Sequence, residues 1–250
     1  MTTKLLQPEI EPDSGYFDVA GFASAALANA SALAAVFDHT LLKPEATHDQ
    51  VVKLCEEAAT HRFACAMVNP VWVSLAHSVM VGSGVPVGVV VGFPLGASLT
   101  TTKREEALSL IKLGAHDVDM VMNLGLLKSG MRALVEQDIR GVVQVAHDAG
   151  AVVKVILETS LLSVEEKLLA SELGLAAGAD FLKTSTGFST GGATPADVAI
   201  LRGVAGNRCG VKASGGIRTF SDARAMLEAG ATRIGASASV AILRQYQDEA

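Results

Sequence analysis

Short apolar runs rich in valine and isoleucine alternate with longer amphipathic stretches along most of the chain. Runs of this kind are typical of buried parallel strands, and the stretches between them have the length of helices. The alternation continues without a linker, so it predicts a series of strand–helix units. The predicted strands are Val36–Leu41, Ala64–Val68, Val85–Val91, Asp117–Met122, Val152–Leu157, Asp180–Lys183, Gly210–Ala213 and Arg233–Gly235.

The segments between the strands carry residues that start and stop helices. Ser163, with Glu166 three positions later, predicts a capping box. Ala-Gly pairs such as Ala149–Gly150 and Ala229–Gly230 place glycine just past a helix, where a left-handed residue ends the last turn. Eight evenly spaced units favour an α/β fold with a single closed (β/α)8 barrel. An open doubly wound sheet is the alternative, although no early strand is followed by GxGxxG.

The expected barrel domain spans residues 36–250 and follows an N-terminal helical extension of residues 1–35. An uncharged run, Val19–Phe37, has the length of a membrane span. It is mostly alanine with some polar residues, and the acids Asp13 and Asp18 precede it where an export signal carries basic residues. We therefore expect an Ala-rich helix packed on the barrel.

Composition and charge narrow the classes of partner. Of 250 residues, 50% are hydrophobic and 18% are charged, which excludes disordered and collagen-like proteins. The net charge is −6 and no basic run could follow a phosphate backbone, so neither nucleic acid nor a membrane is expected as a partner. Cys55, Cys65 and Cys209 form no CxxC pair, and the histidines form no HxH or HExxH cluster. We expect a cytoplasmic protein with no metal and no cofactor.

Two lysines stand at equivalent places on neighbouring predicted strands. Lys183 ends one strand and Lys212 lies in the next, at the carboxyl ends where barrels carry their chemistry. Adjacent parallel strands are about 4.8 Å apart, so inward-pointing lysines at equal height have neighbouring ammonium groups. Burial and a second positive charge both lower a lysine pKa, and a neutral amine can attack a carbonyl carbon to form a Schiff base.

A carboxylate on another predicted strand could move protons in such a reaction. Asp119 has the same strand parity as Asp117, so both face one side of the sheet, and Asp117 is expected lower in the barrel. Near the barrel mouth, Asp119 could relay protons, directly or through a water, while a carbinolamine forms and collapses. The alternative is a purely structural ion pair of Asp119 with Lys154 or Lys212.

Glycine-containing turns follow the last three predicted strands. Barrels often bind phosphate in this region through backbone N–H groups and a helix N-terminus. The turns therefore predict a small phosphorylated carbonyl compound as the ligand. The expected contact residues are Thr186, Gly187, Gly215, Gly216 and Ser237.

Four segments resemble motifs of the deoxyribose-phosphate aldolase family. They are Asp-His-Thr-Leu-Leu-Lys-Pro at 38–44, Val-Asp-Met-Val-Met-Asn at 118–123, Phe-Leu-Lys-Thr-Ser-Thr-Gly-Phe at 181–188 and Val-Lys-Ala-Ser-Gly-Gly-Ile at 211–217. The resemblance runs in order from about residue 36 to about residue 240. It implies a class I, metal-free lyase that reversibly cleaves 2-deoxy-D-ribose 5-phosphate to D-glyceraldehyde 3-phosphate and acetaldehyde, in deoxynucleoside catabolism.

The resemblance also implies roles for individual residues. Lys183 would form the Schiff base, Lys212 would perturb the pKa of Lys183 and assist proton transfer, and Asp119 would act as general acid and base with a water. Supporting positions are assigned to Lys154, Asp38 and Cys65, the thiol as a buried small apolar group.

The chain departs from the family pattern in three places. Many members have two consecutive serines after the eighth strand, whereas here Ser237 is followed by alanine, so one hydroxyl is missing or displaced to Ser239. Some members have lysine in place of Phe188. Some end in a tyrosine that assists proton transfer, whereas this chain ends Gln-Tyr-Gln-Asp-Glu-Ala, with Tyr246 before the end. We expect the activity to persist and the phosphate contacts to vary.

Other functions remain open on these observations. A transaldolase-like enzyme or another Schiff-base sugar-phosphate aldolase would use the same lysines. A zinc-dependent aldolase would lose activity in a chelator, and a non-catalytic barrel would bind phosphorylated metabolites as a sensor or scaffold. An outer helix rich in alanine and valine also suggests a homodimer.

Overall fold

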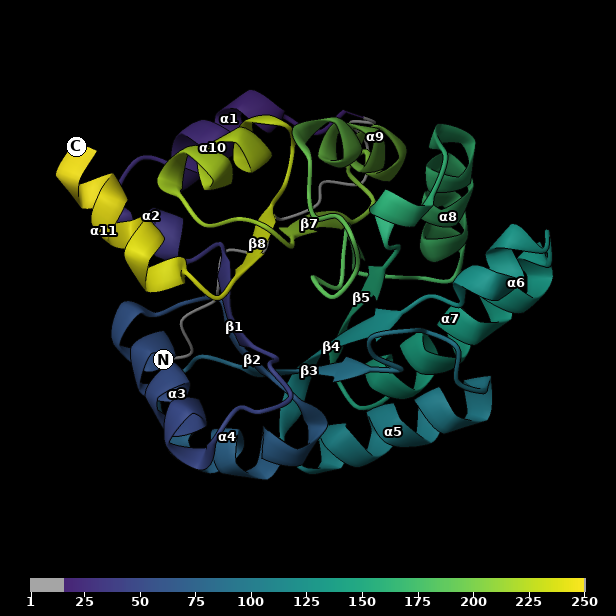
Figure 1. Cartoon of the computed structure of the whole chain (residues 1–250), viewed down its shortest axis with the longest axis horizontal. Coiled ribbons are helices and arrows are strands. Elements are labelled where there is room, and N and C mark those ends of the chain that lie inside the picture. Colours follow the sequence, from purple (N-terminus) through teal and green to yellow (C-terminus); the bar gives the residue numbers. More distant parts are fainter. Residues whose placement is uncertain (1–15, 250) are drawn as a thin grey trace.

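The predicted strands form a closed parallel barrel in chain order, and the major helices surround it (Figure 1). A computed structural model describes residues 16–249. The last strand pairs with the first, so the (β/α)8 prediction is confirmed and the open-sheet alternative is wrong. The strands are β1 (Phe37–Leu41), β2 (Cys65–Val68), β3 (Val87–Val91), β4 (Ala115–Val121), β5 (Val152–Ile156), β6 (Phe181–Lys183), β7 (Gly210–Ser214) and β8 (Arg233–Ala236).

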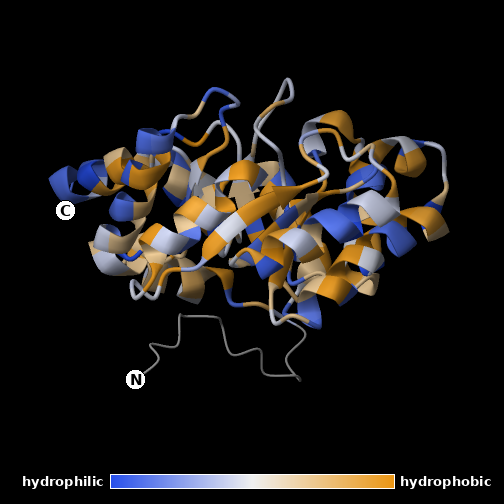
Figure 2. Ribbon diagram, turned by 90° about the horizontal axis from the view of Figure 1, so that it is seen from below, coloured by the Kyte–Doolittle hydropathy of each residue, from blue (hydrophilic) through white to orange (hydrophobic). Residues whose placement is uncertain are grey.

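The helices are amphipathic and bury one side against the barrel. Figure 2 shows hydrophilic and hydrophobic residues mixed along the helices. Their bounds are α1 (Val19–Ala26), α2 (Ala30–Ala34), α3 (His48–His61), α4 (Val73–Met80), α5 (Thr100–Lys112), α6 (Leu124–Lys128), α7 (Arg132–His147), α8 (Val164–Ala176), α9 (Pro195–Ala205), α10 (Phe220–Glu228) and α11 (Ser239–Glu249), with short 3₁₀ turns η1 (Pro70–Trp72) and η2 (Thr159–Leu161).

The helix boundaries agree with the predicted stop and start residues. The hydroxyl of Ser163 accepts the N–H of Glu166 at 3.2 Å, and the carboxylate of Glu166 accepts the N–H of Ser163 at 2.9 Å, so the capping box is confirmed. Gly150 and Gly230 have φ of 74° and 110°, the left-handed region expected after a helix. Two strands begin two residues from their predicted start: β3 begins at Val87 and not at Val85, and β4 begins at Ala115, before the predicted Asp117. Gly114, with φ of 109°, already ends the turn before β4.

The helical extension before β1 consists of two short helices, α1 and α2, where the Ala-rich run had suggested one. Asn29 interrupts it, because its side chain accepts the N–H of Ala32 at 2.9 Å and thereby begins α2. Helix α1 packs on α10 and α2 packs on α11, as Figure 1 shows. Between residues 16 and 249, no helix is long and apolar enough to cross a membrane. Residues 1–15 of the predicted extension, including Asp13, lie outside the described residues.

The strand register separates an apolar outer face from a charged interior. Val118 pairs with Val153, and these side chains are fully buried between the strands and the helices. The next positions on the same strands, Asp119 and Lys154, also pair and point to the other side, into the barrel. The fold therefore places charged groups from several strands in one enclosed space.

Candidate active site

The two predicted lysines lie side by side inside the barrel. Lys183 of β6 and Lys212 of β7 are paired in register, and each is at most 3% exposed. Both ammonium groups donate to the same atom, Oδ2 of Asp119 on β4, at 2.6 Å from Lys183 and 2.7 Å from Lys212. The structure thus brings together three side chains that are far apart in the sequence.

Two further carboxylates extend this cluster toward the bottom of the barrel. Asp38 of β1 accepts from Lys212 and, at 3.0 Å, from Arg233 of β8. Lys154 donates to Asp117, and its Nζ lies 3.5 Å from carboxylate oxygens of both Asp38 and Asp119. The closest partner of Lys154 is therefore Asp117, not Asp119. Asp117 sits lower in the barrel, as its strand position predicted.

The cluster holds one more cation than carboxylates. Its cations are Lys154, Lys183, Lys212 and Arg233, and its carboxylates are Asp38, Asp117 and Asp119. A buried unbalanced charge is costly, so the cation with the weakest support is favoured to lose its proton. Among the described residues, Lys183 has Asp119 as its only ion-pair partner, whereas Lys212 has both Asp119 and Asp38.

The pKa values follow this imbalance. Burial lowers the pKa of Lys183, Asp119 opposes this change and the charge of Lys212 adds to it, and the net result is a pKa of about 8. Burial alone would raise the pKa of Asp119, but the charges of Lys183 and Lys212 outweigh it and hold that pKa well below its ordinary value. Burial would lower the pKa of Lys154, yet the surrounding carboxylates raise it above the ordinary value. Lys183 is therefore the amine that can be neutral near physiological pH.

A pocket of about 420 Å³ opens above the lysines at the carboxyl ends of the strands. All five predicted phosphate-contact residues line it: Thr186, Gly187, Gly215, Gly216 and Ser237. Gly187, Gly215 and Gly216 have φ between 81° and 88°, a conformation that glycine adopts without strain. Between residues 16 and 249, the backbone N–H groups of these three glycines have no hydrogen-bond acceptor. They are free to bind an anion.

The three departures from the family pattern have different places in the structure. Ser239 is fully buried and its hydroxyl donates to the carbonyl of Ala236 at 2.9 Å, so it does not replace the missing serine of the pocket. The hydroxyl of Tyr246 donates to the carbonyl of Leu27 at 3.0 Å, which engages it with the N-terminal extension. Phe188 is half exposed and lines the pocket.

Comparisons with known proteins agree with this geometry. A model of the DeoC/LacD family of aldolases matches residues 32–246. The chain belongs to the DeoC/LacD aldolase family. It is 55% identical over 218 residues to the deoxyribose-phosphate aldolase of Halalkalibacterium halodurans. The aligned region covers 87% of this chain and 97% of that protein. The deoxyribose-phosphate aldolase of Streptococcus sanguinis is 56% identical over 207 residues, covering 83% and 93% of the two chains.

The fold also agrees with a solved structure of a deoxyribose phosphate aldolase. The tetrameric deoxyribose phosphate aldolase of Aeropyrum pernix superposes with a TM-score of 0.86 at 36% identity, over 93% of this chain and 98% of that one. The barrel of this DeoC/LacD aldolase therefore has an architecture that is known from experiment.

Two pocket residues of this DeoC/LacD aldolase were missed in the sequence. Lys43, after β1, and Arg218, after β7, both line the pocket beside the glycine turns. Each is largely exposed, and in the sequence neither can be distinguished from an ordinary charged residue on the surface. Their signal was their position directly after strand ends, where pocket loops begin. They add positive charge to the pocket that Gly187, Gly215 and Gly216 also line.

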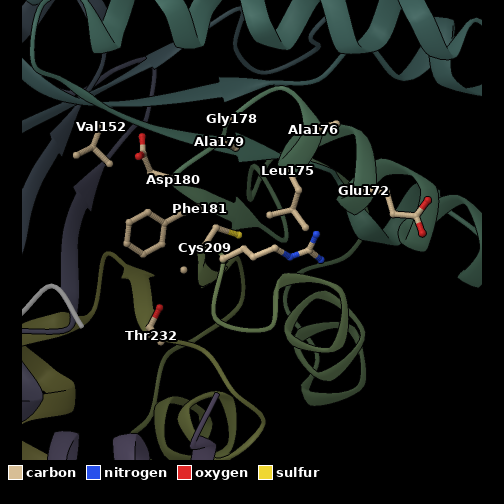
Figure 3. A pocket seen from close by; sticks show the side chains of 12 residues that line it. Val152, Glu172, Leu175, Ala176, Gly178, Ala179, Asp180, Phe181, Cys209 and Thr232 are labelled. Carbon is tan, nitrogen blue, oxygen red and sulfur yellow. The ribbon is translucent and has the colours of Figure 1, made fainter. Parts of the chain in front are cut away.

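A second pocket, of about 450 Å³, opens at the opposite end of the barrel (Figure 3). Leu175, Phe181 and Cys209 are among the side chains around it, and neither Lys183 nor Lys212 lines it. The amino-terminal end of a barrel usually serves stability, so we assign the chemistry of this DeoC/LacD aldolase to the pocket above the lysines.

One group of potential metal ligands lies under the lysines. Ligand atoms of Asp38, Cys65 and Asp117 lie within 4.8 Å of one another. The ammonium group of Lys154 already contacts Asp117, so a cation is built into this cluster. Burial also raises the pKa of the Cys65 thiol, which disfavours the thiolate that binds metals. Cys65 packs with Met67 and serves as an apolar filler.

Proposed function

We propose that this chain is a deoxyribose-phosphate aldolase of class I. It reversibly cleaves 2-deoxy-D-ribose 5-phosphate to D-glyceraldehyde 3-phosphate and acetaldehyde, in the breakdown of deoxynucleosides. The close relatives of that name support the reaction. The observation that carries the mechanism is the buried Lys183, with its pKa lowered to about 8, sharing one oxygen of Asp119 with Lys212.

The first step forms a bond between Nζ of Lys183 and the carbonyl carbon of the open-chain sugar. The neutral amine supplies the electron pair, and the carbonyl oxygen takes up a proton to give a carbinolamine. Loss of that oxygen as water leaves the positively charged imine. Asp119 is ionised at rest, and its Oδ1 has no hydrogen-bond partner in the described part of the chain. It can therefore accept and return the protons of this step, directly or through a water.

The second step breaks the bond between carbons 2 and 3 of the sugar. A base removes the proton of the C3 hydroxyl, the C3 oxygen becomes the aldehyde of glyceraldehyde 3-phosphate, and the electron pair of the bond moves to the iminium nitrogen. The resulting enamine is protonated at carbon 2 and then hydrolysed, which releases acetaldehyde and Lys183. Lys212 donates hydrogen bonds to both Asp119 and Asp38, so its positive charge stabilises the ionised carboxylate of Asp119, which moves these protons.

The other end of the substrate fits the glycine turns. A phosphate carries acceptor oxygens and negative charge, which match the free N–H groups of Gly187, Gly215 and Gly216. Lys43 and Arg218 add positive charge nearby, and Ser237 adds a hydroxyl. The missing second serine removes one donor from this set.

Trapping with borohydride tests the mechanism directly. Acetaldehyde and sodium borohydride are added to the purified enzyme, and peptide mass spectrometry locates the product. We expect an ethyl group on Lys183, since reduction makes the imine permanent, and no such group in Lys183→Met. Lys128→Met serves as the control, because Lys128 is a partly exposed lysine on the surface and its replacement should leave the fold and the adduct on Lys183 unchanged. An ethyl group on a different lysine, or none, contradicts the assignment.

Two further assays separate the remaining alternatives. Full activity in a chelator contradicts a zinc-dependent aldolase, and we expect activity to be retained. A panel of phosphorylated sugars distinguishes deoxyribose 5-phosphate cleavage from a transaldolase-like reaction. Binding of the sugar phosphate without turnover would instead support a sensor or scaffold.

The cellular setting is part of the same proposal. We place the enzyme in the cytoplasm, because Cys55, Cys65 and Cys209 are all unpaired and buried. We propose a homodimer as its assembly, with no nucleic acid and no membrane as partners and with no cofactor. Light scattering coupled to gel filtration measures the mass in solution, and a monomer would contradict the dimer.

A further inference from the structure

Glu158 is a buried acid held in a backbone conformation that glutamate rarely adopts. It follows β5, is 3% exposed and has φ of 55°. Between residues 16 and 249, Arg62 is the one other non-glycine residue with positive φ. Glycine or asparagine would adopt this conformation with less strain. A strained position that holds a buried carboxylate indicates that the side chain itself is needed there.

The contacts of Glu158 lie on the turn that follows the Schiff-base lysine. Its Oε2 accepts the hydroxyl of Thr186 at 2.5 Å and the backbone N–H of the same residue at 3.3 Å. The hydroxyl oxygen of Thr186 in turn accepts the N–H of Phe188 at 3.0 Å. Gly187 is therefore held between two anchored residues, while its own N–H remains free.

The rest of this region is held without Glu158. Backbone hydrogen bonds continue the sheet beyond the strands. The N–H of Leu157 donates to the carbonyl of Lys183 at 2.9 Å, and the N–H of Thr159 donates to the carbonyl of Thr184 at 2.9 Å. Thr184 donates to the carbonyl of Lys212 at 3.0 Å. Lys183 and Thr184 are thus fixed by the sheet. The Thr186–Phe188 turn lies beyond these bonds, and the Glu158 carboxylate supplies its anchor.

We propose that Glu158 is a positioning residue for the phosphate end of the pocket, acting through Thr186 on the N–H of Gly187. The proposal rests on the proposed function. Glu158 does not line the pocket, so it touches neither the phosphate nor the reacting atoms. Its effect is to order a glycine-containing turn before the substrate arrives, which lowers the entropy lost on binding. It should matter for the phosphorylated end of the substrate and not for the imine chemistry.

Two substitutions of Glu158 separate the effect of its carboxylate from the effect of its backbone conformation. Glu158→Gly relieves the positive φ but removes the carboxylate, and Glu158→Gln keeps the length and one acceptor oxygen without the charge. The parameters kcat and KM are measured for 2-deoxyribose 5-phosphate and for unphosphorylated 2-deoxyribose. For the glycine variant we expect KM for the phosphorylated sugar to rise about tenfold or more. Its kcat/KM for 2-deoxyribose should stay within about twofold of wild type.

The glutamine variant should resemble wild type on both sugars, since its amide oxygen can accept the same hydrogen bonds. Glu158→Asn tolerates the positive φ, but its side chain is one carbon shorter and should not reach the hydroxyl of Thr186, so it should give the same selective rise in KM. It provides a second test if the glycine variant does not fold. An equal loss on both sugars, or no loss in either Glu158→Gly or Glu158→Asn, would overturn the proposal.

Acetaldehyde trapping distinguishes this failure from failure of the proposed function. Acetaldehyde has no phosphate, so Glu158→Gly should still gain an ethyl group on Lys183 at the wild-type rate. If the wild-type enzyme gains none there, the aldolase mechanism fails. If it gains one while the two sugars lose activity equally in the variants, only the positioning role is overturned.

Discussion

At the scale of single residues, the site depends on one carboxylate oxygen. Oδ2 of Asp119 accepts from both Lys183 and Lys212, so a charge change on Asp119 or on Lys212 alters the pKa of Lys183. This coupling predicts opposite pH effects for substitutions of the cation and of the anion beside Lys183. Two variants therefore test one electrostatic model.

Replacing Lys212 should move the activity to higher pH. In the wild type, kcat/KM should rise as the pH passes about 8, where Lys183 loses its proton. Lys212→Leu removes a positive charge that lowers the pKa of Lys183, so that pKa rises and the rising limb moves to higher pH. The rate should also fall by about 10²–10⁴-fold through lost proton transfer. An unmoved limb in the pH profile would exclude this electrostatic role.

Replacing Asp119 should have the opposite effect on the profile. Asp119→Asn removes the negative charge that supports the protonated form of Lys183, so the rising limb moves to lower pH. Proton transfer is lost as well, and we expect kcat to fall about 10²–10⁴-fold. Single-turnover rates across pH measure both effects, and circular dichroism checks the fold. A shift to higher pH would be inconsistent with the model.

The sequence predicted the reacting groups because they break an apolar pattern. A lysine at the end of a buried strand is costly unless it has a function or a partner, and this made Lys183 and Lys212 visible. The role of Glu158 could not be predicted, because its contact with Thr186 spans 28 residues and depends on a backbone angle that no residue pattern indicates. Lys43 and Arg218 were missed because exposed charges are common.

At the scale of elements, an ion pair joins α5 to α7 beside the strand that carries Asp119. Lys103 is fully buried and donates to Asp138 at 2.6 Å and to the carbonyl of Val121, the last residue of β4, at 2.9 Å. Thr100 donates to the other oxygen of Asp138 at 2.8 Å. This cluster fixes two helices and the end of β4 together.

Breaking this pair on one side should destabilise the protein strongly. Lys103→Met leaves the buried carboxylate of Asp138 without its cation, and we expect a loss of about 3–5 kcal/mol in the free energy of unfolding. The double variant with Asp138→Leu should recover most of that loss. Urea denaturation measures both. Lys128→Met is the control, since its ion pair with Glu166 lies at the surface, where water screens the charges, and should contribute little to stability. Equal losses in the two single variants would contradict this view.

Most strands were predicted well because they are short apolar runs, and a glycine with positive φ, such as Gly114, Gly150, Gly178 or Gly230, precedes several of them. The two helices before β1 were not separated, because alanine is compatible with one continuous helix and the break depends on a single capping contact of Asn29. The pairing of Lys103 with Asp138 could not be predicted, since it follows from the packing of α5 on α7.

At the scale of the whole molecule, the buried charges tie stability to pH. The pKa values of Asp38 and Asp119 are held far below their ordinary values in the folded protein. Each carboxylate therefore contributes stability that is complete above about pH 4, the unfolded pKa, and is lost as the pH falls below it.

We expect the free energy of unfolding to fall below about pH 4 by about 1.4 kcal/mol per pH unit for each of these carboxylates. Urea denaturation between pH 7 and pH 2.5 measures this slope. Asp38→Asn should be less stable at pH 7 and should show a shallower slope, whereas the exposed Asp148→Asn should match wild type. A slope that Asp38→Asn leaves unchanged would assign acid denaturation to other groups.

The closure of β1 on β8 also affects how the protein is made. Asp38 is translated early, but its partners Lys212 and Arg233 follow 174 and 195 residues later. Until Arg233 has been synthesised, Asp38 lacks one of its cationic partners and the barrel lacks its last strand. A polypeptide that terminates before β8 therefore cannot close the barrel around Asp38, and such products should be inactive.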